Sequence, residues 1–237
     1  MTVRLGLATR VKLAKVMVIT SSRRSSGDLS TRVQAAFAGG VDIVQLRAPV
    51  DAAADQVLDL RELVRVAGDS GLVSAYGVPE YADSAQVDLL QLSALDGPAG
   101  EARAFVGPHT VLGRSCHSAA QVDAAIADAE VAFFTISPVF NAAGVGEAGL
   151  ELVRYAARRA PLGSQAKPWF AVGGVDLENL DQVLAAGARR VGVTRAILDA
   201  EDPARAAAAF KDRLTQAWNA DPGSERLVLD AFGGGVS

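Results

Sequence analysis

The chain alternates throughout between two kinds of segment. Short runs rich in β-branched or aromatic residues are each followed by a longer segment, rich in Ala and Leu, in which apolar residues recur with helical spacing. This alternation is typical of repeated βα units, and therefore of an α/β protein with a parallel sheet. Eight runs have the character of strands, at residues 15–20, 41–47, 72–76, 88–93, 110–114, 131–136, 169–172 and 190–193.

Eight such units within residues 15–219 fit a closed (β/α)8 barrel, the TIM-barrel fold, better than an open sheet. A doubly wound Rossmann-type sheet is the alternative, but no glycine-rich turn follows the first strand. We expect one barrel domain over 15–219. A flexible or strand-leading arm over 1–14 is expected to precede it, and a Gly-rich tail over 220–237, frayed or packed only locally, to follow it.

Charge and cysteine content limit the partners. A net charge of -4 gives no electrostatic reason to expect nucleic acid or an anionic membrane as partner. No run approaches the roughly 20 apolar residues that a membrane helix needs. The single cysteine, Cys116, can form neither an internal disulfide nor a thiolate zinc cage, so a reducing, cytoplasmic location is the default expectation.

The stretch 112–118, LGRSCHS, is the strongest candidate for chemistry. It places His117, one of only two histidines, directly ahead of a predicted helix over 119–129. Imidazole can give or take a proton near neutral pH, so His117 is a candidate general acid/base. The alternative is a histidine that only hydrogen bonds to backbone beside a helix N-terminus. Cys116 is expected to be a small core residue that points away from the site.

The other candidates lie where a barrel places its site, at the C-terminal ends of the strands. Gln45 and Arg47 end the second strand two residues apart, so both side chains should point to the same side. Ser115 follows the fifth strand, next to the histidine, and is a candidate orienting hydroxyl.

Two glycines, Gly173 and Gly174, follow the seventh strand, and Thr194 and Arg195 follow the eighth. Barrels often bind phosphate with backbone N–H groups of these two loops, helped by a short extra helix that Thr194 and Arg195 could begin. The glycines would let the backbone approach an anion closely. A simple turn is the alternative, but the position at strand seven favours a phosphate site.

An ordered set of motifs also carries a family resemblance. The motifs are VQLR at 44–47, GRSCHS at 113–118, SPVF at 137–140, AVGGV at 171–175 and the VTRAI that follows. With these, the chain resembles the thiamin phosphate synthase and thiazole tautomerase family of barrels over roughly 16–214. The resemblance implies a phosphorylated thiazole ligand held by the strand-seven and strand-eight loops, and it makes a homodimer possible.

Departures from the family pattern bear on the reaction. A synthase must stabilise a departing pyrophosphate with Mg²⁺ and several cations. Family synthases typically have a lysine where this chain has Pro49, an Asn-Asp pair in the stretch that here reads YGV at 76–78, and a Thr-Pro-Thr-Lys loop that is here NAAG at 141–144. Asp96 could match a metal carboxylate, but one carboxylate is a poor Mg²⁺ site without substrate.

The resemblance therefore favours the tautomerase branch, whose GRS-x-HS stretch includes a proton-shuttling histidine. Turning a thiazole phosphate carboxylate into its aromatic tautomer needs an acid/base, here His117, and an anion clamp, but no metal or other cofactor. The expected substrate-binding residues are Gln45, Arg47, Ser115, Gly173, Gly174, Thr194 and Arg195. Two alternatives stay open: a divergent synthase that recruits Mg²⁺ through substrate phosphates and Asp96, and a non-catalytic protein that binds a phosphorylated ligand.

Overall fold

Eight parallel strands close into a barrel in which neighbours in the chain are neighbours in the sheet, and β8 pairs with β1. The structure is a computed structural model that describes residues 6–48, 51–140, 147–163 and 166–232. The strands are β1 (Val16–Thr20), β2 (Ile43–Leu46), β3 (Leu72–Tyr76), β4 (Leu89–Leu92), β5 (Val111–Cys116), β6 (Phe133–Ile136), β7 (Trp169–Val172) and β8 (Val191–Val193). The prediction of a TIM barrel is confirmed.

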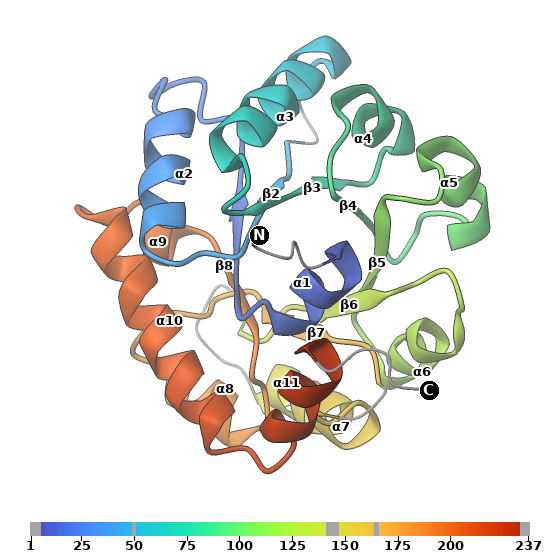
Figure 1. Cartoon of the computed structure of the whole chain (residues 1–237), viewed down its shortest axis with the longest axis vertical. Helices are drawn as coiled ribbons and strands as arrows, with labels where there is room; N and C mark the ends of the chain where they lie inside the picture. Colours follow the sequence, from blue (N-terminus) through green and yellow to red (C-terminus); the bar gives the residue numbers. More distant parts are fainter. Residues whose placement is uncertain (1–5, 49–50, 141–146, 164–165, 233–237) are drawn as a thin grey trace.

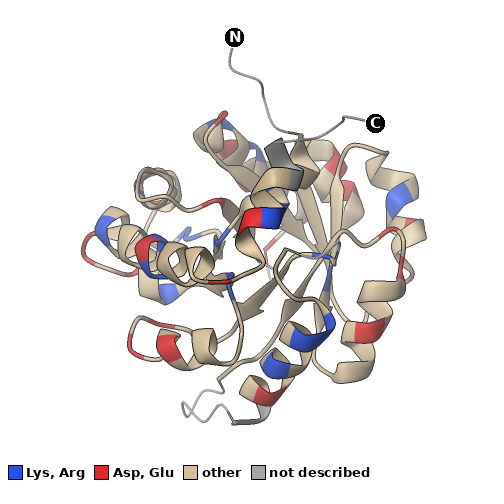
Figure 2. Cartoon of the chain, turned by 60° about the horizontal axis from the view of Figure 1, so that its bottom comes forward, with Lys and Arg blue, Asp and Glu red and all other residues tan. Residues whose placement is uncertain are grey.

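Most of the helices form a ring outside the strands, as Figure 1 shows. The helices are α1 (Leu7–Leu13), α2 (Leu29–Ala38), α3 (Ala53–Ala67), α4 (Pro79–Ala85), α5 (Ala99–Val106), α6 (Ala119–Ala127), α7 (Glu147–Arg159), α8 (Leu180–Ala185), α9 (Arg195–Leu198), α10 (Pro203–Asn219) and α11 (Ser224–Phe232). Residues of both charge signs are spread over the outer helices in Figure 2. Among the described helices, none combines the length and apolar character that crossing a membrane would need.

The strands are apolar on both faces because each strand contributes to two cores. In β1, Val16 and Val18 pack against the surrounding helices, whereas Met17 lies in the barrel interior. Successive strand residues point to opposite faces, which explains why these segments are continuous apolar runs. Phe133 and Phe170 fill the interior with their rings edge to face, 6.3 Å apart between centroids. The barrel is therefore filled below the level at which its polar residues begin.

The N-terminal segment differs from the predicted flexible or strand-leading arm. Residues 7–13 form α1, which lies over the middle of the strand ring in Figure 1. Val11 is 1% exposed and packs with Met17 and Phe133 in the interior core. Leu7, Val11 and Ala14 recur at helical spacing. The helix forms because this apolar stripe covers apolar barrel interior that water would otherwise reach.

The C-terminal segment, expected to be frayed or packed only locally, contains a helix. Residues 224–232 form α11, and Leu227 is buried, while residues 233–237 lie outside the described part of the chain. Arg189 and Asp221 form an ion pair at 3.0 Å, which ties the start of this segment to the turn before β8. The described part of the tail is thus a helix that buries Leu227.

Candidate active site

A cavity of about 870 Å³ opens at the C-terminal ends of the strands. All predicted catalytic and substrate-binding residues except Gln45 line it, namely Arg47, Ser115, His117, Gly173, Gly174, Thr194 and Arg195. These residues are far apart in the sequence, and the closure of the sheet brings them around one space. The remaining candidate, Asp96, lies elsewhere, as described below.

His117 is held by a backbone carbonyl from the neighbouring strand end. Its Nδ1 lies 2.5 Å from the carbonyl oxygen of Ser137, and its own backbone N–H donates to Gln121 Oε1 at 2.6 Å. A carbonyl can only accept, so Nδ1 carries the hydrogen and Nε2 is the nitrogen that can take a proton in the neutral ring. Ser118, not His117, caps α6, because its Oγ accepts the Gln121 N–H.

Strand β5 runs two residues further than predicted, to Cys116, because Ser115 and Cys116 pair with Thr135 and Ile136 of β6. Ser115 therefore belongs to the strand and not to a loop, and it points into the barrel. Cys116 points the opposite way, into the core between strands and helices, as predicted. Burial raises the pKa of the Cys116 thiol to about 12.

A belt of buried polar side chains crosses the barrel beneath the cavity. Its members come from five successive strands: Gln45, Ser74, Gln91, Ser115 and Thr135. The Gln45 amide donates to Gln91 Oε1 at 2.8 Å and to Ser74 Oγ at 3.2 Å. The Gln91 amide donates to Ser115 Oγ at 2.8 Å and to Thr135 Oγ1 at 2.7 Å. The belt supports Ser115 from below.

Gln45 consequently has a different position from the one that the sequence predicts. It is 1% exposed and bonded within the belt, whereas Arg47 stands at the cavity. Sequence reasoning also missed Ser74, Gln91 and Thr135. A signal for them existed, since each is a single polar residue inside an otherwise apolar strand.

Arg47 stacks on an aromatic ring at the cavity wall. Its guanidinium carbon lies 4.3 Å from the centroid of the Tyr76 ring, a distance at which the cation is attracted to the ring face. Tyr76 also lines the cavity. The stacking holds an exposed cation beside the space where a ligand would sit.

The glycines after β7 are needed for both conformation and close approach. Gly173 and Gly174 have φ of 102° and 67°, which side chains rarely allow. A Cβ on Gly174 would lie 2.8 Å from Phe140 Cβ, and one on Gly173 would lie 3.0 Å from Pro138 Cα. Phe140 N–H donates to the Gly173 carbonyl at 3.0 Å. The pair therefore packs against the 138–140 segment while it lines the cavity.

The predicted short helix after β8 is present as α9, a single turn with Thr194 in the N-cap position. Thr194, Arg195 and Ala196 line the cavity. They line the same cavity as the two glycines, which is the arrangement expected for a phosphate held by the last two loops.

Asp96 and the cavity carboxylate Asp176 are the candidate Mg²⁺ ligands. Mg²⁺ is usually held by one or two carboxylates together with substrate phosphates. Asp96 instead accepts the Ser93 N–H at 2.6 Å, and Asp176 accepts the N–H groups of Glu178 and Asn179 in its own turn. Among described residues, no group of three or more His, Cys, Asp or Glu could hold a metal. The described residues thus provide no complete metal site of their own, and a Mg²⁺ ion would need substrate phosphates among its ligands.

Two further departures from the synthase pattern concern residues that the structure does not describe. Pro49 lies in the gap at 49–50, and the NAAG stretch lies in the gap at 141–146. Tyr76, in the third departure, is described and serves as the platform for Arg47.

Comparison with known proteins decides the family. Residues 16–197 match the family model described as thiamine monophosphate synthase. A thiamine-phosphate synthase of Acidothermus cellulolyticus is 42% identical over 208 residues, which cover 86% of this chain and 96% of that protein. The chain belongs to the thiamine monophosphate synthase family. The resemblance drawn from the motifs is thus confirmed at the level of the family.

Two further comparisons support the same family. A thiamine-phosphate synthase of Thermobifida fusca is 43% identical and covers 89% of this chain and 97% of its own length. Among solved structures, thiamine phosphate pyrophosphorylase from Pyrococcus furiosus has a TM-score of 0.74 at 23% identity, covers 88% of this chain and 98% of its own, and shares the fold. These relatives carry the synthase name, which does not support the preference for the tautomerase branch.

Proposed function

We propose that this chain is an enzyme of thiamin biosynthesis that joins a pyrimidine pyrophosphate to a thiazole phosphate in the cavity at the barrel mouth. The observation that carries the proposal is its likeness to proteins named thiamine-phosphate synthase, at 42% identity over 96% of the Acidothermus protein. The family model matches residues 16–197, a range that includes every strand end that lines the cavity. The proposal reverses the preference that the strand-five motif and the departures from the synthase pattern suggested.

Residues of the cavity suit the two ends of such a reaction. The thiazole phosphate would bind the backbone of Gly173, Gly174 and the 194–196 segment. When the bond from carbon to pyrophosphate breaks, the leaving group takes the electron pair, so positive groups facing it lower the barrier. Arg47, on Tyr76, and Arg195 are the cations of the described lining that could serve. Ser115, supported by the belt, would orient a substrate ring.

A second candidate is the metal-free tautomerisation of a thiazole phosphate carboxylate. The contact between His117 Nδ1 and the Ser137 carbonyl favours it, because that contact leaves Nε2 free to accept and return a proton at the cavity. Both candidates use the same phosphate-binding loops. They differ in whether a proton or a pyrophosphate moves.

A paired assay on purified protein separates the candidates. Pyrophosphate release is measured with both synthase substrates and Mg²⁺, and aromatisation of the thiazole phosphate carboxylate is measured without metal. Turnover in the first assay supports the synthase. Turnover in the second alone would replace it with the tautomerase. Silence in both, with thiazole phosphate still bound, would establish a non-catalytic binding protein. A homodimer and a cytoplasmic location stay predictions of the sequence.

A further inference from the structure

The loop between β1 and α2 contains a residue in an unusual backbone conformation. Arg23 has φ of 51°, in the left-handed region that residues with a side chain seldom adopt. Such a conformation persists only where surrounding contacts hold it, and it is concentrated at functional sites. The contacts of the Arg23 side chain therefore show what the conformation serves.

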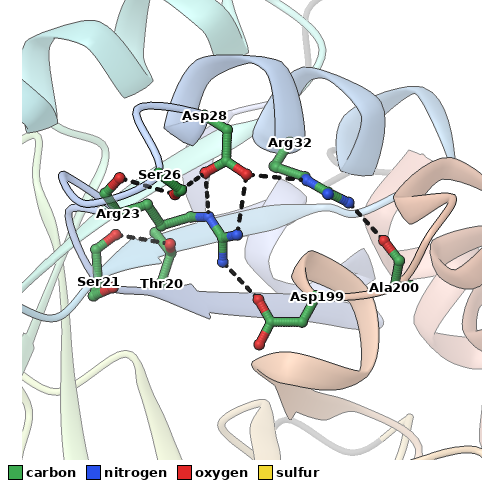
Figure 3. Close-up of polar contacts among 8 residues, drawn as sticks. All are labelled: Thr20, Ser21, Arg23, Ser26, Asp28, Arg32, Asp199 and Ala200. Carbon is green, nitrogen blue, oxygen red and sulfur yellow. Dashed lines mark hydrogen bonds and ion pairs between the residues drawn. The ribbon is translucent and has the colours of Figure 1, made fainter.

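Arg23 joins two segments that are far apart in the sequence, as Figure 3 shows. Its Nε and Nη2 donate to the two carboxylate oxygens of Asp28, at 2.7 and 3.1 Å. Its Nη1 donates to Asp199 Oδ1 at 2.7 Å, and Asp199 directly follows α9. All three nitrogens of the guanidinium thus donate a hydrogen bond, which gives the link a defined geometry.

A second arginine reinforces the link. Arg32, in α2, donates from Nε to Asp28 Oδ2 at 3.2 Å and from Nη1 to the carbonyl oxygen of Ala200 at 2.6 Å. Asp28 lies between the two guanidinium groups in Figure 3. We call Arg23, Asp28, Arg32 and Asp199 the arginine clamp. The clamp ties the start of α2 to residues 199–200.

The clamp displaces a common local interaction. Asp28 occupies the N-cap position of α2, where an aspartate normally accepts a backbone N–H of the first turn. Its carboxylate makes no such bond and instead accepts from Arg23, Arg32 and the Ser26 hydroxyl. Asp202, in the same position of α10, does cap its helix. The helix cap is missing and Arg23 has a left-handed conformation in the same loop. Both features accompany the contacts between Arg23 and Asp28.

Both ends of the clamp border the cavity. Thr20 and Ser21, just before Arg23, form one side, and Thr194 to Ala196 form another. Asp199 N–H donates to the Arg195 carbonyl at 3.0 Å, so a fixed Asp199 fixes the single turn that begins at the cavity wall. The Arg23 side chain stands behind this wall, 18% exposed, and acts on it through Asp199.

We propose that Arg23 is a positioning residue for the phosphate end of the substrate, because it holds the 194–196 wall in place through Asp199. The identity of that substrate rests on the proposed function. Phosphate binding itself does not, since any ligand with a phosphate group would meet the same wall.

The test compares ligands with and without a phosphate. Affinities of inorganic phosphate, thiazole phosphate and the corresponding thiazole alcohol are measured by calorimetry for the wild type, R23M and D199A. Both variants are expected to weaken binding of the two phosphate ligands by about tenfold and to change alcohol binding by less than about twofold. The double variant should be no weaker than R23M, since both changes break one link.

R24M is the matched control. Arg24 is the next residue of the same loop, but its ion pairs are with Asp51, Asp55 and Asp59, on or just before α3. The R24M variant should bind all three ligands with the affinity of the wild type. D199A guards against misfolding of R23M, because it removes only the link to α9 and should show the same selective loss.

The inference is overturned if the clamp variants bind inorganic phosphate as tightly as the wild type. It is overturned as well if their affinity for the thiazole alcohol falls as much as their affinity for the phosphate ligands. It is also overturned if the wild type binds no inorganic phosphate and no thiazole phosphate. If the wild type shows no synthase turnover while the variants still lose phosphate affinity, the proposed function fails and the clamp stands.

Discussion

His117 Nδ1 lies 2.5 Å from the carbonyl oxygen of Ser137, so the end of β6 sets the orientation of the imidazole that follows β5. The contact joins residues from adjacent strands and exists only because the barrel places the two strand ends side by side. It divides the ring into a nitrogen with a structural bond and a nitrogen available for chemistry. An asparagine at position 117 would keep a donor in the place of Nδ1 and lack Nε2, so the two roles can be tested apart.

His117→Asn should lower kcat for tautomerisation by about 10²–10⁴-fold if Nε2 moves a proton. The asparagine amide can still donate to the Ser137 carbonyl, so the thermal midpoint should stay near that of the wild type. His117→Ala should lower both kcat and the midpoint. Activity and differential scanning calorimetry of the two variants check this. Full activity in the asparagine variant would reduce His117 to a structural role.

Gly174→Ala should destabilise the protein by about 1–3 kcal/mol and weaken phosphate binding, because the new Cβ meets Phe140 in a left-handed conformation. Gly68→Ala is the control, since Gly68 also has positive φ but a Cβ added there would meet nothing within 4 Å. Urea unfolding and phosphate titration measure both effects. Equal losses in the two variants would mean that contact with Phe140 contributes nothing.

Gln91→Leu should destabilise the protein by about 2–4 kcal/mol, because it leaves the Gln45 amide, Ser115 and Thr135 without their shared partner in a buried place. Gln34→Leu, at an exposed position of α2, is the matched control and should change stability little. Equilibrium unfolding in urea gives both values. If the hydrogen bonds of the belt contribute little, the two variants will have the same free energy of unfolding.

Cys116 should be unreactive toward iodoacetamide at pH 8 in the folded protein, because burial raises the pKa of its thiol to about 12. The ordinary value is 9.0, so above it the unfolded state loses the proton while the folded state keeps it. This contribution to stability is therefore complete below pH 9 and is lost as the pH rises toward 12.

The measurement for Cys116 compares the wild type with Cys116→Ala, which has no thiol to titrate. Urea unfolding at pH 8 and pH 10.5 should show a larger loss of stability in the wild type. Rapid alkylation of the native protein at pH 8, without unfolding, would contradict the predicted burial of the thiol.

Much of the fold could be predicted because its signals are local. Strands such as β3 and β7 have the predicted bounds, since a run of strand character ends at a turn residue that can be seen in the sequence. The barrel then follows from counting the units. The strand ends near His117, Arg47 and Gly174 follow from the barrel, and so most of the cavity lining is predictable from the sequence.

Tertiary structure alone decided which of these residues meet one another. Gln45 and Gln91 are hydrogen-bonded although 46 residues separate them, and Arg23 reaches Asp199 across 176. Such contacts depend on strand register and on the closure of β8 against β1, which no local pattern specifies. The same holds for α1, whose apolar stripe is visible in the sequence but whose partner, the interior of the barrel, exists only after the sheet has closed.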